Sequence, residues 1–319
     1  MMDCTDRHDR FFLRLMSKNV MLYTEMVATK SAIHGDRKKI LSFSPEEKPL
    51  ALQVGGSNKE ELAEVAKIAE DMGYDEININ LGCPSKKVQK NKFGACLMKE
   101  PELVAECIHS MVSACKIPVT AKTRIGFGEV EDFNYLNNFI RQMRDAGTQT
   151  FILHARKAML SGLSPKQNLN IPKLNYDMVY KIKKENPNLE IIINGGITKV
   201  SEVKDHLNHC DGVMIGRSIY QNPYSLVEIE KEIFNVDNSP TREEVVQKLL
   251  EYLDKEVKEG TKVNHIMRHT VGLYHGQVGS KEWKRYLSDN MMARDSDFQK
   301  AKHIMTIVQN NEKANQTSQ

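Results

Sequence analysis

Short apolar runs alternate with longer amphipathic stretches from residue 21 to residue 218, and this alternation limits the possible folds more than any other feature. Seven runs have the length and composition of buried strands: Met21–Thr24, Leu50–Val54, Glu76–Leu81, Pro118–Thr123, Thr150–His154, Ile191–Asn194 and Gly212–Ile215. Helical periodicity lies between them: Lys59–Met72, Pro101–Ala114, Asp132–Ala146, Tyr176–Glu185 and Val200–Leu207. This alternation predicts a parallel sheet, and seven strand–helix units favour a closed (β/α)8 TIM barrel over an open sheet.

The amino-terminal end does not fit a complete barrel. Counting back from seven strands, we expect the first barrel strand to precede Met1, yet the chain opens directly on M-M-D-C-T-D-R-H. Two interpretations stay open at this point: the first strand is truncated, or the barrel closes in another way.

The pattern changes after Pro223, where strand-like runs stop. A helix is expected over Glu228–Phe234 and a linker over Asn235–Pro240, whose composition favours turns. Only helical periodicity follows: Glu243–Val257, Val263–His275, Ser280–Asn290 and Asp297–Asn310. We therefore predict a TIM-barrel domain over residues 1–235, an all-helical domain over residues 241–310, and a flexible tail over residues 311–319.

Composition narrows the setting in which the protein works. The six cysteines form no C-x-x-C pair and no zinc-type spacing, so we expect free thiols and no metal site. No apolar run reaches the roughly 18 residues of a membrane span, and no secretory segment stands near the start, so the expected location is the cytoplasm. The net charge of +3 is too small to demonstrate a polyanionic partner by itself.

Chemically active side chains fall where the predicted strands end. Because side chains alternate along a strand, Lys122 shares its face with Thr120 and Arg124. The residues at carboxyl ends of strands are Gln53, Asn80, Lys122 and His154, and Cys83 follows its strand on a turn between Gly82 and Pro84. In a β/α barrel this rim carries the catalytic groups.

Two glycine motifs follow the last two strands, I-N-G-G-I at Ile193–Ile197 and I-G-R-S at Ile215–Ser218. Backbone amides at such turns can bind phosphate, and Arg217 adds a charged fork. A single G-G pair is often only a tight turn. Both motifs together, in the two loops that carry the usual phosphate site of the fold, favour phosphate binding.

The residue types at the rim leave three interpretations of Lys122 open. It can be a structural ion-pair partner, or a Schiff-base nucleophile as in aldolase-type barrels. Alternatively, Gln53 can satisfy the amide-like edge of a flavin ring, Lys122 can neutralise charge on reduced flavin, and His154 can support the ring or the phosphate.

A set of motifs resembles the tRNA-dihydrouridine synthases, and most closely their bacterial A-type branch. The motifs run in order from Met1 to about Asn290: M-M-D-C-T-D-R-H, Y-T-E-M, A-L-Q-V-G-G-S, G-Y-D-E-I-N-I-N-L-G-C-P-S, F-G-A-C-L-M, H-A-R-K, L-S-P-K, I-N-G-G-I, D-G-V-M-I-G-R and Y-Q-N-P. The resemblance implies a barrel that holds FMN and a helical domain that grips tRNA.

The resemblance also implies roles for individual residues. The proton donor falls on Cys83. The FMN contacts fall on Met1, Met2, Gln53, Lys122, His154, Asn194, Gly195, Gly196, Gly216 and Arg217. The tRNA contacts fall on Asn80, Lys166, Lys281 and Lys284. The alanine–proline pair that usually precedes the residues matched by Met1 and Met2 is absent here. Leu169 stands where relatives often have arginine.

The implied reaction is reduction of the C5–C6 double bond of uridine in the tRNA D-loop, at positions 20 and 20a in this branch, with NADPH recharging the FMN. Hydride goes to C6, and Cys83 protonates C5. An ordinary cysteine thiol, with a pKa of about 8.5, is protonated at neutral pH and can donate. The uridine must leave its stack to be reached. A monomer without a metal is expected.

The carboxyl-terminal region adds a charge argument. From Lys262 to His303 there are eight Lys and Arg residues against four Asp and Glu, which fits a phosphate backbone or an ordinary solvated face. His265 and His269 lack the glutamate of a metalloprotease motif, so we expect them to face RNA with Arg268. Trp283 is expected to pack in the helical core. Two rivals remain, a phosphate-binding lyase that uses Lys122 and a non-catalytic tRNA-binding protein.

Overall fold

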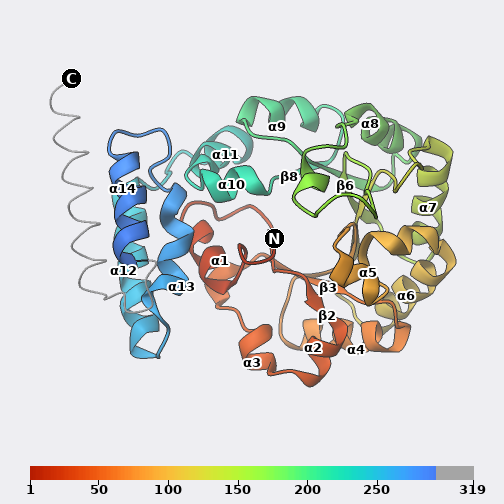
Figure 1. Cartoon of the computed structure of the whole chain (residues 1–319), viewed down its shortest axis with the longest axis horizontal. Helices are drawn as coiled ribbons and strands as arrows, with labels where there is room; N and C mark the ends of the chain where they lie inside the picture. The colour runs from red at the N-terminus through yellow and green to blue at the C-terminus, as the bar shows by residue number, and fades with distance from the viewer. Residues whose placement is uncertain (292–319) are drawn as a thin grey trace. The chain divides into compact units, whose positions relative to one another are not determined.

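The computed structural model of the chain describes residues 1–291 (Figure 1). The helix predicted over Asp297–Asn310 and the tail predicted over residues 311–319 lie outside the described residues. The described part divides into two compact units: residues 1–2 with 21–215, and residues 3–20 with those from Gly216 onward. The amino-terminal segment thus groups with the carboxyl-terminal helices, which differs from the division expected from the sequence.

One parallel sheet forms the centre of the first unit. Its strands are β1 (Leu22–Tyr23), β2 (Val27–Ala28), β3 (Leu50–Gly55), β4 (Glu76–Leu81), β5 (Val119–Arg124), β6 (Thr150–His154), β7 (Glu190–Asn194) and β8 (Gly212–Met214). Hydrogen-bonded neighbours follow the order β1-β3-β4-β5-β6-β7-β8, and β2 also pairs with β3. β2 therefore lies beside the same strand as β1 and does not extend the sheet.

Helices cover the outside of this sheet, and the five predicted between residues 59 and 207 are among them (Figure 1). They are α2 (Thr29–His34), α3 (Arg37–Ile40), α4 (Lys59–Asp71), α5 (Lys86–Lys90), α6 (Pro101–Ala114), α7 (Phe133–Asp145), α8 (Tyr176–Glu185) and α9 (Val200–Leu207). Successive helices pack on one another, α4 on α6, α6 on α7 and α7 on α8. This is the arrangement of a β/α TIM barrel, with an apolar layer between strands and helices.

Local signals explain where the helices begin and end. Asn58 caps α4, and its side-chain oxygen accepts a hydrogen bond from the N–H of Glu61 at 2.7 Å. Gly73, at φ +85°, ends the same helix in the left-handed conformation that glycine adopts at little cost. Leu52, Ile77 and Ile79 are fully buried side chains of the sheet that these helices cover.

The described residues of the second unit form helices joined by turns, with no strand among them. It contains α1 (Arg7–Arg14), α10 (Arg217–Gln221), α11 (Ser225–Phe234), α12 (Arg242–Lys258), α13 (Val263–Met267) and α14 (Ser280–Tyr286). Trp283 is fully buried in it and donates from Nε1 to the carbonyl of Thr270 at 3.0 Å. The predicted core role of this tryptophan is confirmed.

Candidate active site

Polar residues of neighbouring strands stand opposite one another in rows across the sheet. In one row Gln53 of β3 pairs with Asn78 of β4, which pairs with Thr120 of β5. In the next row Asn80 pairs with Lys122. Because the strands are parallel and their register is fixed, these side chains lie side by side, with Gln53, Asn80 and Lys122 toward the carboxyl ends of their strands.

Lys122 is a half-buried lysine of β5 whose amine is held by an amide side chain. Its Nζ donates to Oδ1 of Asn194 at 2.9 Å, and Nδ2 of Asn194 donates to the carbonyl of Met214 at 2.7 Å. Burial, with a smaller contribution from the Arg124 guanidinium, lowers the pKa of Lys122 to about 7. Among the described residues no carboxylate counters these effects, so the site favours an anionic group beside Nζ.

His154 ends β6 with its ring packed against the glycine pair that follows β7. His154 pairs with Asn194 across the sheet and is 7% exposed. Gly195 has φ +120°, and a Cβ there would lie 2.6 Å from Cδ2 of His154. The Tyr176 hydroxyl donates to the Gly195 carbonyl at 2.7 Å. The backbone therefore approaches the imidazole in a way that only glycine permits.

The loop that carries Cys83 is held by Asn80. Oδ1 of Asn80 accepts from the N–H of Gly82 at 3.1 Å and from the N–H of Cys83 at 2.9 Å. Its Nδ2 donates to Oε1 of Gln53 at 2.8 Å. The Cys83 carbonyl accepts from the N–H of Ala95 at 2.9 Å, and the cysteine is half-buried. The backbone that carries the thiol is thus held at the rim of the sheet.

Arg124 fastens this loop to the long loop after β6, a role that the sequence analysis missed. Its Nε donates to the Gly82 carbonyl at 3.0 Å, and its Nη1 donates to the carbonyls of Lys157 and Asn168, both at 3.1 Å. Burial lowers the pKa of Arg124 to about 10, so it stays charged at neutral pH. Its place two residues after Lys122 on the same face was the available signal.

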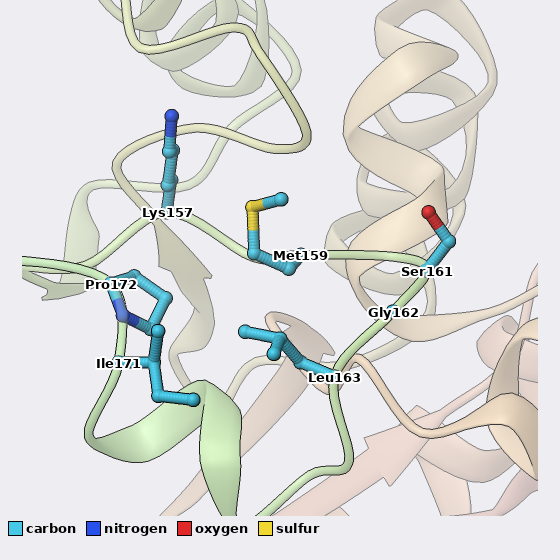
Figure 2. A pocket seen from close by; sticks show the side chains of 7 residues that line it. All are labelled: Lys157, Met159, Ser161, Gly162, Leu163, Ile171 and Pro172. Atoms are coloured by element: carbon cyan, nitrogen blue, oxygen red, sulfur yellow. The ribbon is translucent and has the colours of Figure 1, made fainter.

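The loop after β6 forms an open apolar pocket of about 370 Å³ (Figure 2). Its lining residues are Lys157, Met159, Ser161, Gly162, Leu163, Ile171 and Pro172. Asn168 braces the loop: the Met159 N–H donates to its Oδ1 at 2.7 Å, and its Nδ2 donates to the Met159 carbonyl at 3.0 Å. Gln89 joins the loop to the Cys83 turn by donating to the carbonyls of Leu160 and Pro84, both at 2.9 Å.

The other residues expected at the site lie in several places. Gly196 follows Gly195 and has φ +74°. Met1 and Met2 group with the sheet unit and are 38% and 58% exposed. Lys166 is exposed and precedes the short 3-10 turn Gln167–Leu169.

The remaining expected residues belong to the second unit. Gly216 and Arg217 stand at the start of α10. Lys281 and Lys284 are exposed on α14.

One expectation was wrong. His269 does not face RNA: it is 2% exposed, its Nε2 lies 3.0 Å from Oδ1 of Asp6 and its Nδ1 lies 3.6 Å from Oδ1 of Asp9. Arg268 pairs with the same Asp6 at 2.5 Å. Both side chains connect the amino-terminal segment to the later helices within the second unit. No cluster of His, Cys, Asp or Glu in the described part could hold a metal ion.

Comparison with known proteins gives this site its context. A sequence model described as dihydrouridine synthase matches residues 1–311. The chain belongs to the dihydrouridine synthase family. Among similar proteins, the tRNA-dihydrouridine(20/20a) synthase of Shewanella oneidensis is 49% identical over 310 residues, 97% of this chain and 92% of that protein. The synthases of the same name from Synechocystis and Escherichia coli K12 are each 48% identical, over 92% and 97% of this chain and 88% and 90% of theirs.

A solved structure supports the fold alone. Morphinone reductase superposes with a TM-score of 0.51 at 9% identity, over 75% of this chain and 83% of that one.

Family membership confirms the resemblance seen in the sequence and makes the protein an oxidoreductase that forms dihydrouridine, with FMN as the cofactor of the family and NADPH as its electron donor. No helix among residues 1–291 is long and apolar enough to cross a membrane.

Proposed function

We propose that this member of the dihydrouridine synthase family reduces the C5–C6 bond of uridine in the tRNA D-loop, at positions 20 and 20a, acting in the cytoplasm as a monomer without a metal. The observation that carries the proposal is the arrangement at the carboxyl ends of the strands. There a braced cysteine loop stands beside the amides of Gln53 and Asn80, and Asn80 pairs across the sheet with Lys122, whose pKa burial lowers to about 7.

The side chains present fit FMN. Gln53 donates one N–H to Asn78, and its carbonyl oxygen accepts one hydrogen bond from Asn80. One donor and one acceptor remain for an imide-like ring edge. Lys122 supplies a positive charge where a reduced flavin would carry a negative one. Gly195 and His154 offer a close backbone approach beside an imidazole, and Asn194 orients the lysine. The contacts assigned to Met1, Met2, Gly196, Gly216 and Arg217 complete the proposed set.

Reduced FMN, when bound, would supply the hydride for C6, and Cys83 transfers its thiol proton to C5. Holding the thiol in one place matters more than its acidity alone, because a proton donor must lie within hydrogen-bond reach of the atom it protonates. Asn80 and Arg124 serve this end by fixing the backbone that leads into Cys83.

The basic loop after β6 supports tRNA as the substrate. Residues 155–175 contain four Lys and Arg side chains and neither Asp nor Glu. The same loop lines the apolar pocket, with Lys157 at its edge, and this pocket can receive a nucleobase while the lysines of the loop meet phosphates. Lys166 belongs to this loop, and Lys281 and Lys284 extend the proposed tRNA contacts to the helical unit. Leu169 lacks the charge that relatives often have at its position.

The deciding experiment replaces Cys83 with alanine and measures dihydrouridine in the D-loop by mass spectrometry of tRNA. We expect product formation to fall by about 10²–10⁴-fold, the usual contribution of a general acid, while FMN and tRNA still bind. Cys96→Ala is the matched control, because Cys96 is also half-buried and lies only 13 residues away. Unchanged product formation in the Cys83 variant would remove this residue from the reaction.

The lowered pKa of Lys122 also suits the rival Schiff-base lyase, since a neutral lysine is nucleophilic. The two functions are separated by the purified protein itself. A flavoprotein absorbs near ~450 nm, a property of its cofactor, whereas a lyase is colourless and is inactivated by borohydride in the presence of its carbonyl substrate.

A further inference from the structure

A continuous chain of side-chain hydrogen bonds runs from the Cys83 loop to the opposite end of the sheet. Asn80 Nδ2 donates to Gln53 Oε1 at 2.8 Å, and Gln53 Nε2 donates to Asn78 Oδ1 at 2.9 Å. Asn78 Nδ2 donates to Thr120 Oγ1 at 2.8 Å, and Thr120 Oγ1 donates to Glu76 Oε1 at 2.5 Å. The Tyr23 hydroxyl also donates to Glu76 Oε1, at 2.9 Å.

Every bond in this chain points the same way, toward Glu76. A carboxylate only accepts, so the Thr120 hydroxyl must donate to it and receive the amide of Asn78. The carbonyl of Asn78 then faces Gln53 and can be met only by the Gln53 amide. At the other end, Oδ1 of Asn80 is committed to two backbone N–H groups, so its amide faces the Gln53 carbonyl.

We propose that Thr120 and Glu76 are positioning residues that fix which way the Gln53 carboxamide faces, and thereby which edge of it meets FMN. The inference rests on the proposed function. Neither residue touches the cofactor in this proposal: both act through Asn78. A reversed Gln53 amide would set N–H against N–H at Asn80 and oxygen against oxygen at Asn78.

Burial fixes the direction of each hydrogen bond in this chain. Asn78 is 0% exposed, Thr120 1% and Glu76 7%, so a misdirected group has no water to turn to. Burial raises the pKa of Glu76, and the hydrogen bonds that its carboxylate accepts from Thr120 and Tyr23 act against that shift. A threonine buried only for packing would not need a carboxylate beneath it.

The test compares three variants of β5 as apoproteins titrated with FMN, following the quenching of flavin fluorescence. Thr120→Val removes the relay hydroxyl and keeps the side-chain shape. It should weaken FMN binding by about three- to tenfold, the worth of roughly one net hydrogen bond, and shift the flavin reduction potential. Thr120→Ser keeps the hydroxyl and should restore both. Thr120→Ala removes the hydroxyl without adding a methyl group and carries the test if the valine variant does not fold.

Thr123→Val is the matched control, because Thr123 is equally buried on the same strand but bonds only to the backbone carbonyls of Leu81 and Arg124, both at 3.4 Å. It should lower thermal stability without changing FMN affinity or potential. Equal FMN affinity in wild type and in the folded variant that lacks the Thr120 hydroxyl would overturn the inference. A wild-type protein that binds no FMN would instead overturn the proposed function.

Discussion

At the scale of single residues, Lys122 shows how burial prepares a side chain for a partner. Its pKa of about 7 in the absence of cofactor means that it is mostly neutral at pH 8. A negative charge placed beside Nζ raises that pKa again. We therefore expect the protein to take up close to one proton at Lys122 when it binds reduced FMN at pH 8. Calorimetry in buffers of different ionisation enthalpy measures this uptake.

Lys122→Met keeps the length of the side chain and removes the titration. In this variant the proton uptake should disappear and reduced FMN should bind more weakly than it does to wild type. Oxidised FMN, whose ring is neutral, should lose less affinity. Equal proton uptake in the variant and in wild type would show that another group responds to the flavin.

Strand register made the residues of the site predictable from the sequence, whereas contacts outside the sheet follow no register and were not predicted. Gln53, Asn80 and Lys122 were placed on one rim because strand side chains alternate, and the observed pairing brings them together. Arg268 and His269 were interpreted from charge alone. Their partner Asp6 lies more than 250 residues away in the sequence, so no local pattern could reveal the contact.

At the scale of elements, strong hydrophobic periodicity was enough to predict where helices and strands begin and end. The bounds predicted for β4, β6, α6, α8 and α9 agree with the structure residue for residue. The two-residue strand β2 was missed because two residues carry no periodicity. The predicted helix Val263–His275 is instead α13 followed by the 3-10 turn Arg268–Gly272. Helix α1 was also missed, although its N-cap Asp6, which accepts from the N–H of His8 at 2.9 Å, was a readable signal.

The turn after β7 provides a prediction at this scale. Gly195→Ala should lower the free energy of unfolding by about 2–4 kcal/mol, because it adds backbone strain at φ +120° to a Cβ contact with the His154 ring. Chemical denaturation measures the change. FMN affinity should fall as well, since the imidazole must move.

Gly73→Ala separates the two causes. Gly73 also has a positive φ, but a Cβ there meets no atom within 4 Å. It should cost only the backbone strain, about 1–2 kcal/mol, and leave FMN affinity unchanged. If both variants lose FMN equally, the contact between Gly195 and His154 does not matter for the cofactor.

At the scale of the whole molecule, the second unit is assembled from both ends of the chain. Glu230 of α11 accepts from the N–H and the side-chain amide of Asn19 at 3.0 and 2.7 Å, which ties the amino-terminal segment to the later helices. Sequence patterns predicted its helices but not this assembly, because contacts across 200 residues depend on burial and pairing rather than on local periodicity. The charged groups that make the assembly possible also set its response to pH.

His8 lies at the centre of this assembly and should make it sensitive to acid. Its Nδ1 is 2.7 Å from the Tyr252 hydroxyl and 4.0 Å from Oε2 of Glu256. Burial lowers its pKa to about 4; nearby Asp6 acts to raise it, and Arg7, His269 and His265 act to lower it.

The sign of the effect follows from the two states. The unfolded chain, with a histidine pKa near ~6.5, binds more protons than the folded one between pH 6.5 and 4. Stability from His8 is therefore complete above about pH 6.5 and is lost as the pH falls toward 4, by about 3 kcal/mol in all.

His8→Gln removes this titration, and the comparison with wild type isolates it from the neighbours. Burial raises the pKa of Asp9, and that shift makes stability increase as the pH falls, in opposition to His8. The Asp9 effect is common to both proteins and cancels in their difference. Chemical denaturation followed by helical circular dichroism should show wild type losing about 2–3 kcal/mol more than the variant between pH 7 and pH 4.5. Parallel pH profiles would mean that His8 titrates alike in the folded and unfolded chains.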